Sequence, residues 1–242
     1  MVGDVLRATR LSQLVRATPG GAHTLGALFA AAAGVVAFAR VTEDYLTNDP
    51  LAHWDVSFAR WLAEHRTPSG VDLFRVVTFF GSPATVLVLA AIVAIVLFRR
   101  RLVAETALLV LVLGGTELVN VLLKLAFHRP RPQVAFVHLD TYSFPSGHAM
   151  ISTATAIVFA ALAWRAGRRA AITTATAAAV AAVGFSRLYL GAHYLSDVLA
   201  GIAGGLTCAA LALAAYWAFG ERFAAWFAGS RLDRLGRAVL RA

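Results

Sequence analysis

Three short polar segments interrupt an otherwise apolar sequence between residues 124 and 197. They read KLAFHRPRP from Lys124, PSGH from Pro145 and SRLYLGAHYLSD from Ser186. The side chains in them whose types and spacing could do chemistry are three permanent cations, two imidazoles and one carboxylate: Lys124, Arg131, Arg187, His148, His193 and Asp197. This balance of charge suits a polyanion such as a phosphate group, and it is wrong for a neutral substrate or a divalent metal.

The order and spacing of these segments resemble the signature of a known family, the type 2 phosphatidic acid phosphatases. That signature is Lys-x6-Arg-Pro, then Pro-Ser-Gly-His, and then Ser-Arg-x5-His-x3-Asp, and all three parts are present here in order. The resemblance extends over roughly residues 70–220. Because all three parts match at once, it is specific.

The resemblance implies a role for each histidine. His193 is expected to be the nucleophile and to form a phosphohistidine, and His148 is expected to be the general acid that protonates the leaving oxygen. Asp197 follows His193 by four residues, so the two side chains share a face if this segment is helical. The carboxylate would then fix the tautomer of the imidazole and stabilise its charged form.

The remaining candidates would bind the phosphate. Lys124, Arg131 and Arg187 are the expected clamps, because arginine can bind two phosphate oxygens at once and lysine supplies a point charge. Ser146 is a good helix N-cap and Gly147 allows close backbone approach, so a helix would begin under the phosphate. The first backbone N–H groups of that helix, including that of Ser146, would add donors to the site.

Each of these residues also has an ordinary structural explanation. A His–Asp pair can cap a helix, Pro-Ser-Gly-His can begin any helix, and a lysine or arginine at a helix end often reaches for the membrane interface. These explanations do not account for three cations that coincide with two histidines on one face. Arg129 lies outside the family pattern, and we assign it no role beyond attraction of a lipid headgroup.

Other polar residues lack signature spacing. Glu117, Asp140 and Ser143 could contribute to the pocket. The other histidines are expected at the surface or in the membrane interface, and they are His23, His53, His65, His128 and His138. No carboxylate cluster suits Mg²⁺ and no His/Cys set suits Zn²⁺, so we expect no cofactor and a metal-independent reaction.

The composition is that of a helical membrane protein. Of the 242 residues, 59% are hydrophobic and only 14% are charged, and the mean hydropathy is +0.70. Several apolar runs reach the length needed to cross a bilayer, and they are continuous rather than alternating, which favours helices. The net charge of +9 is expected to set topology and attract anionic lipid headgroups rather than to bind nucleic acid.

The predicted fold is all-α, an integral membrane bundle of six transmembrane helices with short interfacial helices. The six spans are expected at about 22–39, 82–98, 103–123, 148–164, 170–186 and 197–219. The chain divides into a cytoplasmic N-terminal segment at 1–21, the six-span domain at 22–219 and a basic amphipathic tail at 220–242. The basic start and the first apolar run would also fit a cleavable signal peptide.

Two further patterns concern packing. Gly201 and Gly205 form a small-xxx-small face, which indicates close helix approach within the bundle. The longest polar connection before the signature, residues 41–78, has an apolar helical face and a charged one: Trp54, Phe58, Trp61 and Leu62, opposite Asp55, Arg60, Glu64 and Arg66. We expect a short helix in the membrane interface with its tryptophans at headgroup depth. It could gather a lipid substrate or only seal the bundle.

The arginines predict an orientation. Clusters follow the second and fourth spans, at residues 99–101 and 165–169, and others lie near both termini. Basic residues favour the cytoplasmic side, so both termini are expected there. Both signature-bearing loops then share the extracytoplasmic face. The expected location is a bacterial plasma membrane.

Together these inferences favour a membrane phosphatase that removes a terminal phosphate from a lipid phosphate or diphosphate. The candidate substrates are a polyprenyl phosphate or diphosphate such as undecaprenyl diphosphate, phosphatidic acid, and phosphatidylglycerol phosphate. The alanine- and arginine-rich composition suggests a bacterial source and so favours the polyprenyl lipids. The alternatives are a phosphotransferase of the same family, a non-catalytic lipid-phosphate carrier and a purely structural scaffold. The oligomeric state is left open.

Overall fold

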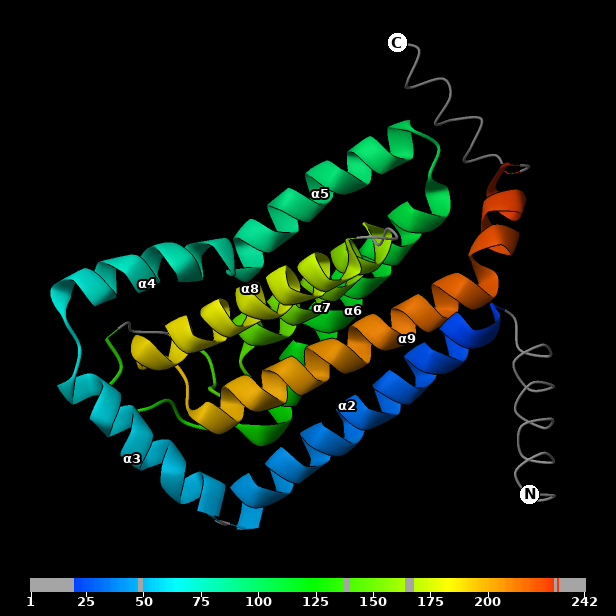
Figure 1. Cartoon of the computed structure of the whole chain (residues 1–242). Helices are drawn as coiled ribbons and strands as arrows, with labels where there is room; N and C mark the ends of the chain where they lie inside the picture. The colour runs from blue at the N-terminus through cyan, green and yellow to red at the C-terminus, as the bar shows by residue number, and fades with distance from the viewer. Residues whose placement is uncertain (1–19, 48–49, 137–139, 164–167, 229, 231–242) are drawn as a thin grey trace.

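The computed structural model describes residues 20–47, 50–136, 140–163, 168–228 and 230. Within these ranges the chain forms eight α-helices and no strand. The helices are α2 (Gly21–Thr47), α3 (Pro50–Glu64), α4 (Pro68–Phe80), α5 (Pro83–Arg99), α6 (Val103–Phe127), α7 (Gly147–Leu162), α8 (Arg169–Tyr189) and α9 (Leu195–Ala228). They form an elongated bundle, with α3 lying across one end (Figure 1). The prediction of an all-α membrane bundle is confirmed.

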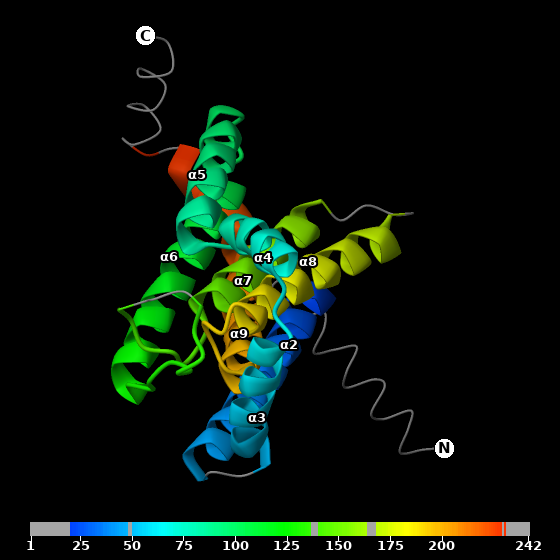
Figure 2. The ribbon, with the colours of Figure 1, turned by 90° about the vertical axis from the view of Figure 1, so that its left-hand side faces the viewer.

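The helices differ in how they could cross a bilayer. Among the described residues, four helices are long and apolar enough for a span, namely α2, α6, α8 and α9. The pair α4 and α5 meets the same test together, although it is bent by 41° at its junction. The fourth predicted span, at about 148–164, corresponds to α7, which has only 16 residues. Short length is tolerated there because α7 lies inside the bundle, between α6, α8 and α9 (Figure 2).

Close packing of α7 against α9 depends on the predicted glycine face. A Cβ atom at Gly201 would lie 2.6 Å from the carbonyl oxygen of Ser146, and one at Gly205 would lie 2.4 Å from that of Met150. Backbone oxygens cannot give way as a flexible side chain can, so only glycine fits at these two positions. The first turn of α7 is therefore held directly against the first turns of α9, where two of the three signature segments meet.

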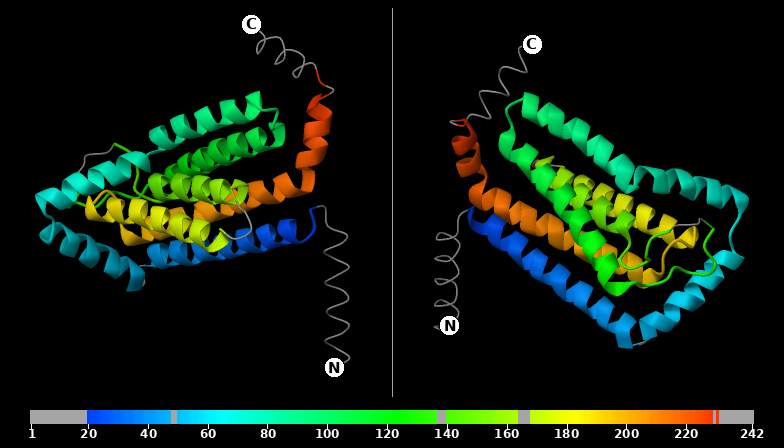
Figure 3. Two further views of the ribbon diagram at one scale, coloured as in Figure 1. Left: turned by 45° about the horizontal axis from the view of Figure 1, so that its top comes forward. Right: turned by 180° about the vertical axis from the view of Figure 1, so that it is seen from behind.

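Residues 41–78, predicted as a polar connection with one short helix, are mostly helical and belong to three helices. α2 continues to Thr47, α3 follows, and α4 begins after the N-cap Thr67, whose side chain accepts the N–H of Gly70 at 3.1 Å. α4 then leads into α5 through the bend, as the views in Figures 1 and 3 show. The sequence pattern missed α4 because it is the first half of a bent span.

The predicted interfacial helix exists as α3, but one residue of its predicted charged face, Asp55, is buried against the protein. Trp54 and Trp61 are 65% and 51% exposed, as expected at headgroup depth. Asp55, predicted on the face opposite the tryptophans, is only 1% exposed and lies on the buried face with Ala59 and Leu62. In a membrane interface apolar residues can face outward, so a buried face can carry the polar group.

The sixth span is longer than predicted. α9 runs for 34 residues to Ala228, so residues 220–228 of the predicted tail continue this helix. Its last turns change direction and approach the end of α5 (Figure 3), where the ring centroids of Phe227 and Phe98 lie 6.3 Å apart. Residues 231–242 of the predicted tail and residues 1–19 of the predicted N-terminal segment lie outside the described residues.

Candidate functional site

The two signature-bearing loops meet at one end of the bundle and are joined by backbone hydrogen bonds. The N–H of Phe136 donates to the carbonyl of Leu190 at 3.0 Å, and the N–H of Ser146 donates to the carbonyl of Asp197 at 2.9 Å. The first loop connects α6 to α7, and the second connects α8 to α9. The prediction that these loops share one side of the bundle is confirmed (Figure 1).

His193 and Asp197 form a buried pair at the start of α9. The Nδ1 atom of His193 lies 3.4 Å from Oδ2 of Asp197, and the side chains are 2% and 0% exposed. His193 precedes the helix, so the pair does not arise from two helical side chains on one face. Instead Asp197, in the first turn, reaches back to accept the N–H of Tyr194 at 2.9 Å. The same oxygen also accepts the hydroxyl of Ser143.

This geometry fixes the tautomer of His193. A carboxylate beside Nδ1 accepts a hydrogen bond from the Nδ1–H group, which leaves the Nε2 lone pair directed away from Asp197. Burial lowers the pKa of His193 to about 3, although the Asp197 carboxylate acts in the opposite direction. The imidazole is therefore neutral near pH 7, with Nε2 able to act as a nucleophile.

Arg131 lies on the Nε2 side of His193. One of its guanidinium nitrogens is 3.3 Å from Nε2 and donates to the carbonyl of Ala192 at 2.7 Å. Its Nε donates to the carbonyl of Thr141 at 2.7 Å. Burial lowers the pKa of Arg131, but arginine remains charged. Contacts with both loops thus hold a fixed positive charge beside Nε2 of His193.

Lys124 and Arg187 bring two more cations to this place from different helices. Lys124, in the last turn of α6, donates from Nζ to the carbonyl of Tyr142. Arg187, in the last turn of α8, is buried and donates to the hydroxyl of Thr78 in α4 at 2.6 Å. The Nε of Arg187 has no hydrogen-bond partner among the described residues. A buried donor without a partner is costly, so this atom is suited to a ligand.

The start of α7 agrees with the prediction in position but not in every bond. Ser146 is the N-cap residue, yet its hydroxyl makes no capping bond and, within the described part of the chain, has no partner. Its N–H donates to Asp197, so this N–H is not a phosphate donor, contrary to the prediction. The N–H groups of Gly147 and His148 lie in the first turn, where a helix offers no internal acceptor. Asn120 packs against Gly147, where a Cβ atom would lie 2.9 Å from its Oδ1.

The second candidate histidine faces the same place. His148 is partly buried and lies within electrostatic range of the other candidates: Arg187, His193, Arg131 and Lys124. The candidates Lys124, Arg131, His148, Arg187, His193 and Asp197 therefore lie within interaction range of one another. We call Lys124, Arg131, Arg187 and Ser146 the outer cluster, and they lie near the buried His193–Asp197 pair.

Sequence reasoning missed a second group of residues behind the pair. Arg129 is 6% exposed, and its two terminal nitrogens donate to three acceptors. One nitrogen lies 2.6 Å from Oδ1 of Asp197 and 2.6 Å from Oγ of Ser196, and the other lies 2.7 Å from Oδ2 of Asp55. Burial works against the charge, but the Asp197 and Asp55 carboxylates outweigh it and raise the pKa of Arg129. The prediction that Arg129 attracts a headgroup is therefore wrong, because its side chain points inward.

Aromatic rings and a helix terminus complete this group. The guanidinium carbon of Arg129 lies 4.3 Å from the ring centroid of Tyr45 and 4.4 Å from that of Tyr194. Asp55 also accepts the N–H of Ser196 at 2.9 Å, so a carboxylate from α3 satisfies the N-terminus of α9. We call Asp55, Arg129, Ser196 and Asp197 the inner cluster.

The other polar residues considered from the sequence lie in different settings. Ser143 contacts Asp197, as described above, and Glu117 lies within electrostatic range of Lys124. His23, His65 and His128 pack against aromatic rings, His53 is exposed, and His138 lies outside the described residues. Among the described residues, no three His, Cys, Asp or Glu side chains are grouped so that they could hold a metal ion.

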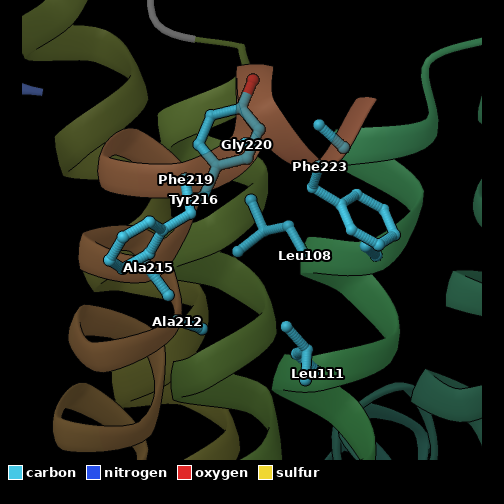
Figure 4. Close-up of a pocket in the computed structure, with 10 residues that line it drawn as sticks. Leu108, Leu111, Ala212, Ala215, Tyr216, Phe219, Gly220 and Phe223 are labelled. Carbon is cyan, nitrogen blue, oxygen red and sulfur yellow. The ribbon is translucent and has the colours of Figure 1, made fainter. Parts of the chain in front are cut away.

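A separate apolar groove lies between the first half of α6 and the second half of α9 (Figure 4). It encloses about 180 Å³ and is lined by residues such as Leu108, Leu111, Phe219 and Phe223. Lys124 is thirteen residues beyond Leu111 on α6, roughly 20 Å along the axis. This groove is therefore distant from the candidate site, on the surface that α6 and α9 present to lipid.

The fold and the site define an all-α membrane protein in which several cations surround a histidine, and this histidine contacts a buried carboxylate. The PAP2 superfamily model matches residues 105–221. The chain is 33% identical over 147 residues to phosphatidylglycerophosphatase B of Bacillus subtilis, a match that covers 58% of this chain and 72% of that protein. It is 36% identical over 133 residues to decaprenylphosphoryl-5-phosphoribose phosphatase of Mycobacterium tuberculosis, covering 52% and 68% respectively. The chain belongs to the PAP2 superfamily.

Solved structures agree with this assignment. A crystal structure of a transmembrane PAP2 type phosphatidylglycerolphosphate phosphatase from Bacillus subtilis matches with a TM-score of 0.71 and 27% identity, covering 76% of this chain and 94% of that one. Aquifex aeolicus LpxE has the same fold, with a TM-score of 0.55, 24% identity and coverage of 66% and 94%. The resemblance found in the sequence is confirmed, and the Bacillus and Mycobacterium relatives are all named as phosphatases.

Proposed function

We propose that this protein hydrolyses a terminal phosphate from a lipid phosphate or diphosphate through a phosphohistidine on His193. The observation that carries the proposal is the geometry around Nε2. Asp197 holds the other ring nitrogen, and Arg131 lies 3.3 Å from Nε2 itself. Cations alone would serve a carrier, but a carrier has no use for an imidazole held in one tautomer.

In the first step the Nε2 lone pair of His193 attacks phosphorus. The P–N bond forms as the bond between phosphorus and the leaving oxygen breaks, and His148 gives that oxygen a proton. The cations Lys124, Arg131 and Arg187 stabilise charge on the non-bridging oxygens. Asp197 stabilises the positive charge that develops on the imidazole when Nε2 becomes bonded to phosphorus.

In the second step water attacks the phosphohistidine. His148, now neutral, takes a proton from that water, the P–N electron pair returns to the ring of His193, and inorganic phosphate leaves. Both steps move protons and charge between groups of this chain and the substrate. Three cations already neutralise the phosphate, so we propose that the reaction does not require a divalent metal.

A cavity beside the site supports a lipid substrate. It measures about 250 Å³ and lies where α4 meets α5, against α7 and α8. Its lining includes Ser152 on α7 and Val183 on α8, which lie one helical turn from His148 and Arg187 respectively. The cavity therefore begins on the helix faces that carry two site residues and extends toward the middle of the bundle. A lipid tail could lie there while its phosphate lies at the site.

Within the lipid phosphates, we favour a polyprenyl phosphate or diphosphate as substrate. One relative is named for a decaprenyl lipid and another for a glycerolipid, so both kinds of tail occur among proteins similar to this one. The bacterial composition of the chain favours the polyprenyl lipid, as argued from the sequence. Phosphatidic acid and phosphatidylglycerol phosphate are the alternative substrates, and the experiment below includes both.

The site is proposed to face the extracytoplasmic side. Arg99, Arg100 and Arg101 lie just before α6, whereas Lys124 lies in the last turn of that helix. The arginine cluster and the site are therefore at opposite ends of one span. Basic clusters favour the cytoplasm, which leaves the opposite side, in a bacterial plasma membrane, for the site.

The test is phosphate release by the purified protein in detergent with EDTA, over a panel of the four lipids: polyprenyl diphosphate, polyprenyl phosphate, phosphatidic acid and phosphatidylglycerol phosphate. We expect release that survives EDTA and falls by at least about 10⁴-fold in His193→Gln. Radiolabelled phosphate should be trapped on the wild-type protein as an acid-labile, base-stable adduct. The variant should form no such adduct.

Two results would contradict the proposal. Equal turnover by His193→Gln would exclude the phosphohistidine mechanism, and loss of activity with EDTA that Mg²⁺ restores would exclude metal independence. No release from any lipid, with phosphate still protecting both proteins against heat, would favour a carrier or a transferase without its acceptor.

A further inference from the structure

Arg129 connects α3 to the His193–Asp197 pair. It contacts both Asp55 in α3 and Asp197 in α9, across 74 and 68 residues of sequence. Its guanidinium also contacts the rings of Tyr45 and Tyr194. Three hydrogen bonds and two ring contacts therefore restrain the orientation of this side chain.

The consequence of this contact falls on the carboxylate of Asp197. Arg129 and the backbone N–H of Tyr194 hold its two oxygens separately, at 2.6 Å from Oδ1 and 2.9 Å from Oδ2. With Oδ1 fixed, Oδ2 faces His193 Nδ1 at 3.4 Å. Without Arg129, Asp197 would keep only the bonds that Tyr194 N–H and the Ser143 hydroxyl donate to Oδ2. With Oδ1 unbound, the carboxylate could rotate about its Cβ–Cγ bond and lose this alignment.

We propose that Arg129 is a positioning residue for the reaction: it holds Asp197 so that His193 keeps its nucleophilic tautomer, and it does not bind the phosphate. This inference rests on the proposed function of His193. It separates two arginines that lie two residues apart in the sequence, because Arg131 faces Nε2 whereas Arg129 faces the far oxygen of Asp197.

The structure also explains why lysine can replace Arg129 only in part. The guanidinium spans acceptors on two helices with two nitrogens, and it contacts two rings. An ammonium is a compact point charge that cannot do both. A lysine would keep the charge near Asp197 but would leave Asp55 or Ser196 without its donor.

The experiment compares Arg129→Gln and Arg129→Lys with wild type, using the lipid phosphate that wild type hydrolyses best. We expect kcat to fall by about 100-fold in Arg129→Gln, because small displacements of a catalytic group have effects of this size, with KM changed less than about 3-fold. Arg129→Lys should recover part of the loss. Both variants should still be protected against heat by inorganic phosphate, since the outer cluster is intact.

Arg75→Gln is the matched control. Arg75 also pairs with an aspartate, Asp72 at 3.8 Å, and stacks on a ring, Phe136 at 5.0 Å, but it lies at the surface of α4. The Arg75→Gln variant should have the same kcat and KM as wild type.

If Arg129 is only structural, the activity of its variants will fall in proportion to the folded fraction. The value of kcat per folded molecule will then be unchanged, which would overturn the proposal. A rise in KM without a fall in kcat would overturn it too.

A measurement without turnover keeps the test independent of the proposed function. The Nδ1 proton of His193, held by Asp197, should give a downfield NMR signal in ¹⁵N-histidine-labelled protein, assigned by its absence from His193→Gln. The signal should persist in the control Arg75→Gln. It should weaken in Arg129→Lys and disappear in Arg129→Gln. Its persistence in Arg129→Gln would overturn the proposal, whereas an inactive wild type that shows the expected pattern would contradict only the proposed function.

Discussion

The inner and outer clusters lie next to each other but differ in how their polar atoms are satisfied. In the inner cluster both carboxylates have both oxygens bonded, and the Arg129 nitrogens meet acceptors from α3 and α9. In the outer cluster the Ser146 hydroxyl and the Arg187 Nε have no partner among the described residues. Buried polar groups are normally paired, so a saturated cluster indicates a fixed support and an unsaturated one indicates a place for a ligand.

The two clusters also differ in the sign of their net charge. The inner cluster contains two carboxylates and one guanidinium, and its surplus negative charge lies against the N-terminus of α9, where it is stabilised. The outer cluster contains three cations without a carboxylate of their own. Only an incoming anion would balance it, which accords with the proposed phosphate site.

The largest effect that would sharpen this comparison is expected from Arg187→Gln in the outer cluster. Loss of one donor to developing charge should lower kcat/KM by about 10²- to 10³-fold, and heat protection by inorganic phosphate should weaken. Thr78→Val is the control, since it removes the hydrogen bond of 2.6 Å but keeps the cation. Equal phosphate protection in Arg187→Gln and wild type would show that Arg187 is not part of the anion site.

A smaller catalytic effect is expected from Asp55→Asn in the inner cluster, together with a large effect on stability. Removing one partner of a buried ion pair costs about 3–5 kcal/mol, so the melting temperature in detergent should fall clearly. We expect kcat to fall about 10-fold with KM unchanged, because Arg129 keeps Asp197 but loses its anchor on α3. Asp72→Asn, at the exposed pair with Arg75, is the control. A raised KM in Asp55→Asn would remove the distinction between the clusters.

The smallest effect is expected from pH. An exposed histidine changes charge near pH 6.5, but burial lowers the pKa of His193 to about 3. The folded-state pKa is depressed, so the neutral form is kept as pH falls and the ring protonates only in strong acid. The ¹⁵N signals of His193 in the substrate-free protein should therefore not titrate between pH 5 and 8. A midpoint between pH 6 and 7 would show that the pair is open to water.

Much of the site could be predicted because its residues lie in three short segments that together match one family signature. Within a segment the spacing is also informative, since His193 and Asp197 are only four residues apart. The inner cluster has no such signal, because Asp55 lies 74 residues before Arg129. A charge on an amphipathic helix is ordinarily expected at the water-facing side, and this expectation put Asp55 on the wrong face.

Details of bonding were also beyond the sequence. Ser146 was correctly placed at a helix start, but its N–H is taken by the carbonyl of Asp197, because Gly201 lets α9 approach α7. The bend between α4 and α5 was missed because α4 is short, and it is long and apolar enough for a span only together with α5.

The sequence by itself determined the class of this protein. Continuous apolar runs require helices in a bilayer, since backbone polar groups must be bonded within each span. The three signature segments determined which cations and histidines would meet. Only the tertiary structure decided which charges are satisfied and which are open, because that depends on partners from α3, α4 and α9 that are distant in sequence. Arg129 and Arg131 show this most directly: two arginines of one loop, one enclosed by carboxylates and rings and the other placed at Nε2 of His193.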